Sequence, residues 1–424
     1  NQVEGLLFSR VNVAMIHGRG CLDPDEGDEG NGNMCPRLIR NLIPAIDRSG
    51  ARSAIKLGMF DDTGSYQGAR NRVRGYPEGT RFDFADHADA LYFFWDLNMK
   101  IWFDMVPRDL WYLQEGRPVV AFWTASEYFF QNNQGNSSIL LRSLRARFIE
   151  RYGMDPWFNV DDSWIKLDST ITTNDVQAIN GWFGPPQNTG TFRQWAGKTW
   201  GAITPSFRDS PTLPGCGAAC REVPRGTLGS NFLNYLTQHV TLRSIFTLIE
   251  GFTDTVEGNG LYRSDVWDYP SLYLNLVREH ADPETRTLRF QAEAADRYSD
   301  RDTENRGGQF RDGGLDVGNI DGPDAGWFVG WTDPGEWIQY ERIQTGFASY
   351  RFTIRYATPL DGQRVRLEID GRSLGTVTLP RTGDWQKWGY WQLGNRFLLP
   401  GKHTIRLVFE TGGVNADWFF LKRL

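Results

Sequence analysis

The sequence predicts an α/β protein, a (β/α)8 TIM-like barrel followed by an all-β sandwich. A chain of 424 residues exceeds the usual size of one hydrophobic core. Short apolar runs alternate with helical patterns before residues 281–290, whereas strands with period-two alternation and Gly turns follow. The pattern therefore predicts a barrel domain over 1–281, a charged linker over 282–289 that contains Pro283, and a sandwich over 290–424.

Eight short apolar runs, each bounded by loop residues, supply the strands of the predicted barrel. They are Val11–Ile16, Ser53–Phe60, Lys100–Met105, Pro118–Trp123, Trp157–Val160, Ala178–Trp182, Thr199–Ile203 and Ser244–Ile249. Amphipathic helical stretches lie between several of them, at Leu38–Ser49, Phe84–Leu97 and Ser138–Arg151. Eight strands alternating with helices are typical of a (β/α)8 barrel, in which chemistry gathers where strands end.

The second part of the chain alternates apolar with polar residues and shows no helical pattern. Its expected strands are Glu336–Ile343, Tyr350–Tyr356, Arg364–Ile369, Thr376–Leu379, His403–Phe409 and Ala416–Leu421. Such a series of short strands predicts a β-sandwich.

Composition narrows the class of protein. Hydrophobic residues make up 40% and charged residues 23% of the chain, which is ordinary for a globular protein. The formal net charge of −6 and the absence of a basic stripe argue against a nucleic-acid partner. No apolar run is long enough to span a bilayer, so we expect no membrane association, and we expect a monomer.

Aromatic residues are unusually frequent, with 17 Trp, 15 Tyr and 27 Phe. Flat aromatic faces bind the apolar surfaces of sugars, while polar groups around them bind the hydroxyls. We therefore expect a polysaccharide or oligosaccharide partner, although most of these rings individually fit a packed core equally well.

The four cysteines form two close pairs, Cys21 with Cys35 and Cys216 with Cys220. Their Gly/Pro/Asp-rich surroundings predict two local disulfides rather than a metal site. Disulfides indicate an oxidising compartment, and the chain begins at Asn1, which fits a mature secreted protein.

Acidic residues that follow predicted strands are the candidates for catalysis. Glycosidic cleavage needs two carboxyl groups in one cleft. Glu250, at the end of the last predicted strand, is the first candidate. Asp161 and Asp162 follow another strand as an adjacent pair, and only one of them points inward. We favour Asp162 as the catalytic partner and Asp161 as a substrate ligand.

Further residues at strand ends are candidates for substrate binding. Asp61 and Asp62 repeat the adjacent-acid pattern, and we expect this pair to position substrate or to serve the structure of the turn. His17 ends the first predicted strand and is a candidate to bind a sugar hydroxyl, with a structural role as the alternative. Trp123, Trp164 and Trp182 are placed to serve as sugar platforms, with burial in the core as the alternative for each. Nucleotide-binding, nucleophilic-serine and zinc-protease motifs are absent, and no cofactor for catalysis is expected.

The C-terminal stretch Phe290–Leu424 resembles family six carbohydrate-binding modules, which are jelly-roll sandwiches. The segments that carry the resemblance are FQAEAAD, VGWTDPGEWIQY, LEIDGRSLGTVTLPRTGDWQKW and HTIRLVFETGGVNADWFFL, which begin at Phe290, Val329, Leu367 and His403. The resemblance implies glycan binding between Trp331 and Trp388, with Asn415 at the base. It also implies a structural calcium ion at Glu293 and Asp417, although Gln291 stands where the family often has an acid.

The first domain resembles (β/α)8 glycoside hydrolases related to families seventy-one and ninety-nine. The resemblance lies in EGRPVVAFW, GAITPSFRDSP and SIFTLIEGFTDTVEGNGLYRSD, which begin at Glu115, Gly201 and Ser244. In those families an acid at the end of the last strand is followed three residues later by a second acid. Glu250 fits the first position, but Thr253 occupies the second, so Asp254 and Glu257 are the nearest substitutes.

These observations predict a secreted glycoside hydrolase that is endo-acting, retains anomeric configuration and is tethered by a C-terminal carbohydrate-binding module. One alternative is a non-catalytic glycan-binding protein with a degenerate barrel, which Thr253 favours. The other is a polysaccharide lyase or esterase, which the scarcity of His and the lack of a serine motif oppose.

Overall fold

A computed structural model of the chain describes residues 2–18, 34–181, 190–208, 220, 222–239, 244–252, 260–322 and 326–424. The chain divides into two compact units. Unit 1 contains residues 1–11 and 261–424, and unit 2 contains residues 12–260. The division does not fall at the linker predicted over 282–289, because the first eleven residues and the segment from Leu261 belong with the sandwich. No helix among the described residues is long and apolar enough to cross a membrane.

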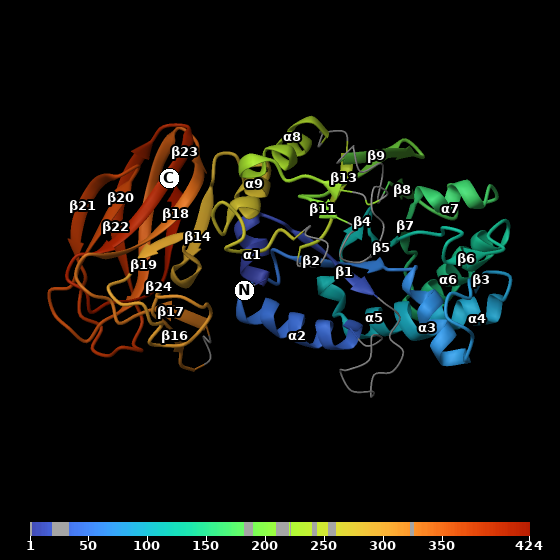
Figure 1. Cartoon of the computed structure of the whole chain (residues 1–424), viewed down its shortest axis with the longest axis horizontal. Coiled ribbons are helices and arrows are strands. Elements are labelled where there is room, and N and C mark those ends of the chain that lie inside the picture. Colours follow the sequence, from blue (N-terminus) through green and yellow to red (C-terminus); the bar gives the residue numbers. More distant parts are fainter. Residues whose placement is uncertain are drawn as a thin grey trace. The chain divides into compact units, whose positions relative to one another are not determined.

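Unit 2 is a mixed α/β fold (Figure 1). Its main sheet has the order β1-β2-β5-β7-β8 with all neighbours parallel, and a second sheet has the order β13-β10-β9. The main-sheet strands are Val13–Gly18 (β1), Lys56–Asp61 (β2), Arg117–Phe122 (β5), Trp157–Asp161 (β7) and Ala178–Asn180 (β8). Those of the second sheet are Gly190–Trp195 (β9), Lys198–Ile203 (β10) and Ser244–Ile249 (β13).

Helices and short strands connect these sheets. The helices are Met34–Arg48 (α2), Ser65–Arg74 (α3), His87–Leu91 (α4), Lys100–Met105 (α5), Asn136–Tyr152 (α6), Asp162–Leu167 (α7) and Ser230–His239 (α8). The short strands are Phe82–Asp83 (β3), Leu113–Gln114 (β4), Phe130–Gln131 (β6), Phe207–Arg208 (β11) and Glu222–Val223 (β12).

The two sheets of unit 2 share a hydrophobic core. One cluster joins Phe60 of β2 and Ala121 of β5 to Ala202 of β10 and Leu248 of β13. A second cluster joins Val119, Trp157 and Ala178 of the main sheet to Trp200 of β10. Both sheets therefore turn one face toward a common interior. Closure into an eight-stranded barrel stays a prediction.

The predicted strand at Lys100–Met105 is wrong, because these residues form helix α5. They continue a helical segment that begins with α4 at His87 and includes a π-helical stretch at Tyr92–Met99. A run of six mostly apolar residues does not distinguish a strand from a buried helix. The helix ends at Val106, which has extended backbone before Pro107. The other predicted strands of this unit overlap β1, β2, β5, β7, β8, β10 and β13.

The described residues of unit 1 form a two-layer antiparallel β-sandwich with two α-helices and a short 3-10 helix, Ala292–Ala294. One sheet has the order β16-β17-β24-β19-β22, with β14 paired to β24, and the other has the order β15-β18-β23-β20-β21. The helices are Gln2–Ser9 (α1) and Leu272–Ala281 (α9). The first sheet contains Thr287–Gln291 (β14), Val317–Ile320 (β16), Gly326–Val329 (β17), Ala348–Ala357 (β19), Gly389–Leu398 (β22) and Asn415–Arg423 (β24). The second contains Arg297–Ser299 (β15), Glu336–Thr345 (β18), Arg364–Ile369 (β20), Arg372–Thr378 (β21) and Gly401–Phe409 (β23).

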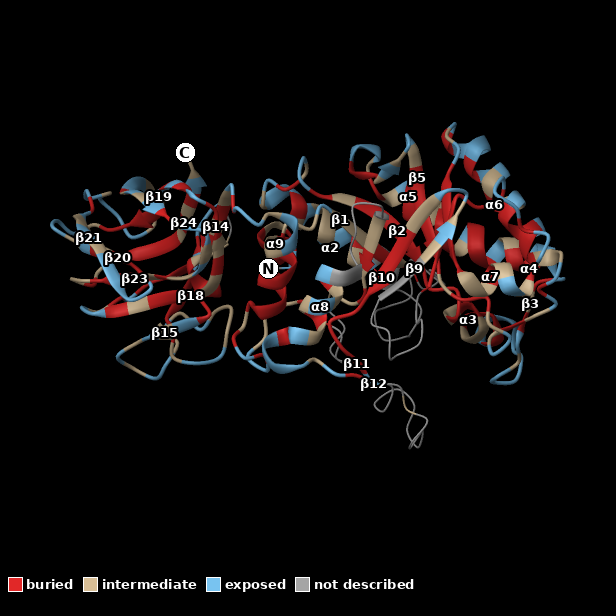
Figure 2. Cartoon of the chain, turned by 90° about the horizontal axis from the view of Figure 1, so that it is seen from above, coloured by how far each residue is buried: buried red, intermediate tan, exposed pale blue. Residues whose placement is uncertain are grey.

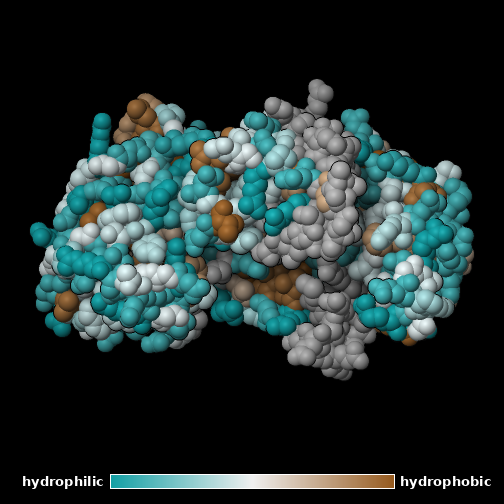
Figure 3. Space-filling model, in the orientation of Figure 1, coloured by the Kyte–Doolittle hydropathy of each residue, from teal (hydrophilic) through white to brown (hydrophobic). Residues whose placement is uncertain are grey.

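Aromatic rings fill the centre of the sandwich. Phe290 of β14 stacks on Phe419 of β24 with ring centroids 4.4 Å apart, and Tyr340 of β18 packs against both. Accordingly, many residues of the sandwich strands are buried between the two sheets (Figure 2). The outer surface of the sandwich visible in Figure 3 is mainly hydrophilic, with hydrophobic residues in small separate patches. The prediction of an all-β sandwich for this region is confirmed.

Candidate functional site

The carboxyl ends of the strands in unit 2 lie level with one another. Gly18, Asp61 and Phe122 are register partners across β1, β2 and β5, and Asp161 of β7 is the register partner of Asn180 of β8. In parallel sheets the residues that follow these ends meet at one edge, where ligands bind.

The side chains that face the common interior at this edge follow from the core cluster. Residues two positions after a core residue point to the same face of a strand. Counting from Phe60, Ala121 and Leu248 places Asp62, Trp123 and Glu250 on the inner side. The sheet hydrogen bonding continues to these positions. The backbone amides of Asp62, Trp123 and Glu250 donate, in that order, to the backbone carbonyls of Gly18, Asp61 and Ile203, over 2.9 Å each.

The same count applies to the other strands of the main sheet. Met15 packs against the core cluster, which places His17 on the inner side. Trp157 and Ala178 belong to the second cluster, which places Asp161 and Asn180 there as well. The inner edge therefore carries three carboxyl groups, an imidazole, an amide and an indole.

Asp161 is the candidate general acid at this edge. It is only 5% exposed, and its Oδ1 accepts a hydrogen bond from the backbone amide of Ser163 over 3.0 Å, which caps helix α7. Burial raises the pKa of Asp161 to about 6, and the neighbouring charge of Asp162 adds to the rise. A carboxyl group with such a pKa holds its proton at mildly acidic pH.

Asp162, which we favoured from the sequence, is engaged in ion pairs instead. Its two oxygens lie 3.0 Å from Lys166 Nζ and 2.8 Å from Arg193 Nε. Asp162 is the first residue of helix α7, so the alternation of β7 does not set the direction of its side chain. The two ion pairs, rather than alternation, distinguish Asp162 from Asp161. Asp161 is therefore the better candidate for chemistry, and Asp162 serves the local structure.

The side chains of Asp61 and Asp62 lie on opposite sides of the main sheet. Asp61 is fully buried on the helical side of the sheet, where it accepts hydrogen bonds from Tyr66 Oη over 2.8 Å and Asn98 Nδ2 over 3.1 Å. This placement favours the structural alternative for Asp61 over contact with substrate. Asp62 Oδ2 lies 3.3 Å from His17 Nε2 on the inner side, and the His17 ring stacks on Phe60.

Glu250 directly follows β13 and is 5% exposed. Asp254 and Glu257, the predicted substitutes for a second acid, lie outside the described residues. The candidate pair that the structure brings to one inner edge is thus Asp161 with Glu250. Asn159, two residues before Asp161, is fully buried, and neither atom of its side-chain amide has a hydrogen-bond partner among the described residues.

The three predicted tryptophan platforms differ in position. Trp123 is partly buried on the inner side, where it packs against the core cluster. Trp164 is fully buried among Phe84, Phe94 and Phe122, and its indole nitrogen donates to the carbonyl of Trp123. A fully buried ring offers no face to a sugar, so the prediction for Trp164 is corrected to a core role. Trp182 lies outside the described residues.

In the sandwich, two of the three residues predicted to bind glycan pack against Phe328. Trp331 is 45% exposed and stacks on Phe328 at 6.0 Å, while the half-buried Trp388 packs against the same ring at 5.6 Å. Asn415 is buried, and its Nδ2 donates to the carbonyl of Trp385 over 2.9 Å. A Cβ at Gly330 would lie 2.8 Å from Asn415 Oδ1, so glycine is needed at that position.

Sequence reasoning missed Asn180 in unit 2 and Trp385 in the sandwich. Asn180 follows Ala178 at period two, so counting from the core would have identified it. Trp385 is 43% exposed, and its carbonyl accepts the hydrogen bond from Asn415 Nδ2. Its position in the segment of turns that follows Asp384 was the available signal.

The residues near the predicted calcium site differ in how their side-chain oxygens are paired. Glu293 is buried, and its Oε2 has no hydrogen-bond partner among the described residues; the same holds for Oε1 of Gln291. Oxygens of this kind suit calcium. Asp417 differs, because its Oδ2 is paired with Arg355. Glu293 and Gln291 therefore fit the ion, and Asp417 is already neutralised.

The predicted disulfides depend on Cys21, Cys35 and Cys216, whose side chains lie outside the described residues. Cys220 is described, at intermediate exposure. The two pairings stay predictions.

A model of a domain of unknown function, DUF5010, matches residues 1–297. The chain belongs to this family. A second model, for family 35 carbohydrate-binding modules, matches residues 311–421 of this DUF5010 protein. Its C-terminal region is therefore similar to carbohydrate-binding modules, and the matching model is that of family 35 rather than of the family six we named.

A cycloisomaltooligosaccharide glucanotransferase from Niallia circulans is 30% identical over 96 residues, which are 22% of this chain and 10% of that protein. The DUF5010 chain thus spans about a tenth of the length of this curated relative.

Solved structures of family six modules also match the sandwich. A β-1,3-glucan-binding module from Bacillus halodurans is 29% identical, covers 32% of this chain and 94% of its own, and has a TM-score of 0.26. The C-terminal module of the laminarinase LamC from Zobellia galactanivorans is 24% identical, covers 32% of this chain and 99% of its own, and has a TM-score of 0.27.

Proposed function

We propose that this protein is a glycoside hydrolase in which unit 2 cleaves a polysaccharide and the sandwich holds the enzyme on it. The observation that carries the proposal is a pair of buried carboxyl groups at strand ends: Asp161 ends β7 of the main sheet and Glu250 follows β13 of the second sheet, and the two sheets share one core. Glycosidic cleavage requires such a pair in most families. Completion of unit 2 as a (β/α)8 barrel is part of the proposal.

Asp161 acts as the general acid in this proposal. Its burial keeps the proton on the carboxyl group up to a pH of about 6, and the group is thus able to protonate the leaving glycosidic oxygen. Glu250 acts as the carboxylate that attacks the anomeric carbon while the bond to the protonated leaving oxygen breaks. Water, deprotonated by Asp161, then hydrolyses the glycosyl-enzyme ester, and the two successive inversions give net retention of configuration. His17, Asp62 and Trp123 line the same edge and position the sugar through hydrogen bonds and ring contact.

The sandwich contributes by raising the local concentration of substrate without altering the chemical barrier. Trp331 supplies an exposed aromatic face, and Asn415 supplies an amide that both donates and accepts hydrogen bonds. Action on internal bonds of an extended chain fits an enzyme held along a polymer.

A second candidate function is glycan binding without cleavage. It is favoured by Thr253, which stands where the related hydrolase families have their second acid. Under this candidate, unit 2 recognises a sugar and releases no product.

A panel of neutral and acidic polysaccharides, incubated with the full chain, tests the proposal. Released oligosaccharides, analysed by chromatography and mass spectrometry, would identify the substrate and support a hydrolase. Unsaturated products absorbing in the ultraviolet would indicate a lyase, and released acetate would indicate an esterase. Retention of polysaccharide in affinity electrophoresis without any product would favour the binding protein.

We also propose that the protein is a secreted monomer with disulfides Cys21–Cys35 and Cys216–Cys220. Mass spectrometry of peptides from the unreduced chain tests the pairing, and light scattering tests the mass. Free thiols at all four positions would contradict the proposed compartment.

A further inference from the structure

Strands β14, β24, β19 and β22 of the first sandwich sheet carry an excess of positive charge. The whole chain has a formal net charge of −6, yet these strands hold several cationic residues and a single acid, Asp417. The cationic residues are Arg289, Arg351, Arg355, Arg396, Lys422 and Arg423. A sheet with this balance of charge attracts anions to its surface.

Alternation along the strands decides which of these side chains point away from the core. Phe352 and Ile354 of β19 are fully buried, so Arg351 points to the outer side of the sheet. Lys422 of β24 is the register partner of Arg351 and points to the same side. Both residues are exposed, and neither has an acidic partner among the described residues.

Aromatic rings lie on the same outer side of the sheet. Tyr390 is 62% exposed, and its ring centroid lies 5.7 Å from that of Trp418. Trp418 in turn packs edge-on against Phe420, with ring centroids 6.3 Å apart. Phe420 and Trp418 are the register partners of Thr353 and Arg355, two and four residues along β19 from the cation pair. Rings and unpaired cations therefore share one surface that extends over about 13 Å along the strands.

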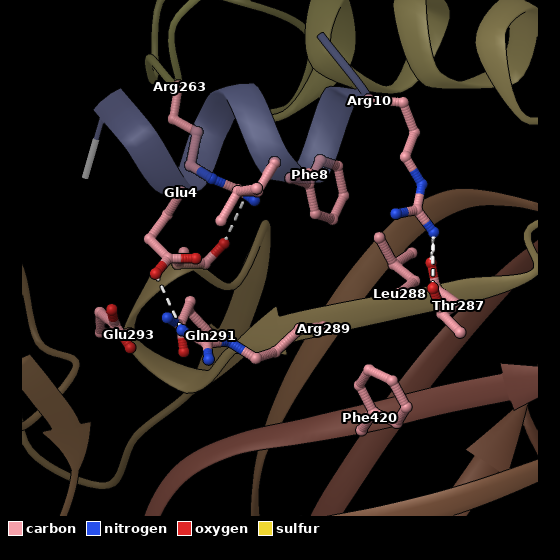
Figure 4. Close-up of a pocket in the computed structure, with 12 residues that line it drawn as sticks. Glu4, Phe8, Arg10, Arg263, Thr287, Leu288, Arg289, Gln291, Glu293 and Phe420 are labelled. Carbon is pink, nitrogen blue, oxygen red and sulfur yellow. Dashed lines mark hydrogen bonds and ion pairs between the residues drawn. The ribbon is translucent and has the colours of Figure 1, made fainter. Parts of the chain in front are cut away.

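Helix α1 borders this surface along β14 (Figure 4). A small cavity beside the helix is lined by Glu4 of α1 and by Arg289 and Phe420 of the sheet. Glu4 Oε1 accepts a hydrogen bond from Arg289 Nη2 over 2.8 Å, which neutralises this arginine. Asp417 neutralises Arg355 in the same way. On the outer side of the sheet, the charges left for a ligand are those of the register pair on β19 and β24.

We propose that an acidic polysaccharide binds to the outer face formed by Tyr390, Trp418, Phe420, Arg351 and Lys422. The rings contact the apolar surfaces of the sugars, and the two cations pair with carboxylate or sulfate groups along the chain. The inference rests on the glycan-binding part of the proposed function, to which it adds a substrate class. It does not depend on cleavage by unit 2.

Two observations favour a polysaccharide over another polyanion. The outer face continues toward the predicted glycan site, because the guanidinium carbon of Arg355 lies 5.1 Å from the ring centroid of Trp388. The number of unpaired cations is also small beside the number of rings. A nucleic acid carries a phosphate at every nucleotide and is typically bound by many more Lys and Arg residues.

Dextran sulfate and uncharged dextran test the charge requirement, because the two polymers share one backbone. Polygalacturonate tests carboxylate groups in place of sulfate groups. We expect the wild-type full chain to bind one or both acidic polymers at least about tenfold more tightly than dextran in affinity electrophoresis and calorimetry. The double variant Arg351→Gln/Lys422→Gln loses at least about tenfold in affinity for the acidic polymer, and Tyr390→Ala also weakens its binding.

The matched control is Arg372→Gln, which removes an exposed arginine of β21 that also lacks an acidic partner among the described residues. Its affinity for the acidic polymer stays within about twofold of wild type, as expected for a charge outside the outer face. Unchanged urea midpoints confirm that each variant is folded. Trp331→Ala separates the outer face from the predicted glycan site, because the double variant weakens acidic-polymer binding in this background as well.

Several results would overturn the inference: no preference of wild type for either acidic polymer over dextran, a double variant within twofold of wild type, or an equal loss in Arg372→Gln. Tighter binding to single-stranded DNA or to phosphatidylserine vesicles than to both acidic polymers would also overturn it, in favour of a different partner. Retained binding of neutral glycans alongside any of these results would leave the proposed function standing. A failure to release product would leave the outer face as a binding site.

Discussion

At the scale of single residues, the position of one tryptophan decides which of two adjacent acids faces the interior. Trp157 lies in the core shared by the two sheets, so Asp161, four residues later, points to the same side. Alternation along the strand predicts that only one acid of the pair points inward. It does not show which, because the face that packs inward depends on contacts with β8 and β10. The ion pairs of Asp162 with Lys166 and Arg193 were equally invisible, since Arg193 is distant in sequence.

The raised pKa of Asp161 predicts the pH dependence of activity. A general acid must carry its proton, and the folded-state pKa of about 6 means that this proton is lost as the pH rises through 6. We therefore expect kcat/KM on the identified polysaccharide to fall above pH 6. Initial rates between pH 4 and 9 measure this. An alkaline limb unchanged in Asp161→Asn would show that another group supplies the proton.

We expect the substitution Trp331→Ala to weaken glycan binding without lowering the stability of the protein. Its ring is 45% exposed, so Trp331→Ala removes little buried area. We expect affinity for the polysaccharide to fall by at least about tenfold, or 1.4 kcal/mol, with an unchanged unfolding midpoint. Phe397→Ala is the matched control, because this ring is 54% exposed at the far end of β22. Equal losses in the two variants would mean that the binding surface lies elsewhere.

At the scale of secondary-structure elements, most strands were predictable because each is short, apolar and bounded by turn residues. Strand β13 occupies the predicted range Ser244–Ile249. The failure at Lys100–Met105 has a physical origin, since Trp102 and Phe103 are buried against neighbouring rings in a helix as they would be in a strand. Strand β22 was missed because exposed residues such as Tyr390 and Trp391 interrupt its alternation.

The buried position of Trp164 predicts a stability effect that is typical of the core. Trp164→Ala leaves a cavity among Phe84, Phe94 and Phe122 and removes the hydrogen bond to the Trp123 carbonyl. We expect the free energy of unfolding to fall by about 3–5 kcal/mol, measured by urea denaturation. Wild-type stability in this variant would contradict the assignment of Trp164 to the core.

At the scale of the whole molecule, the two ends of the chain build one unit. The sequence predicted a sandwich at the C-terminus, but it did not indicate that helix α1 belongs with it. Phe8 of α1 packs edge-on against Phe290 of β14, with ring centroids 6.4 Å apart, and Arg263 lies over the Phe8 ring. A contact between residues so far apart in sequence leaves no local pattern to recognise.

This arrangement predicts that the N-terminal helix supports the sandwich. Phe8 is 4% exposed, and Phe8→Ala is expected to lower the free energy of unfolding of unit 1 by about 3 kcal/mol. Hydrogen exchange followed by mass spectrometry should show faster exchange over β14, at Thr287–Gln291. Unchanged exchange in β14 would mean that α1 adds nothing to the stability of the sandwich.

The central claim is that Asp161 and Glu250 form the catalytic pair. The most direct measurement compares product release from the identified polysaccharide by wild type, Asp161→Asn, Glu250→Gln and the neighbouring control Asp162→Asn. We expect the first two variants to lose at least about 100-fold in kcat, in line with the loss of a general acid, while Asp162→Asn stays within tenfold of wild type. The reverse order, with Asp162→Asn inactive and Asp161→Asn or Glu250→Gln active, would contradict the account.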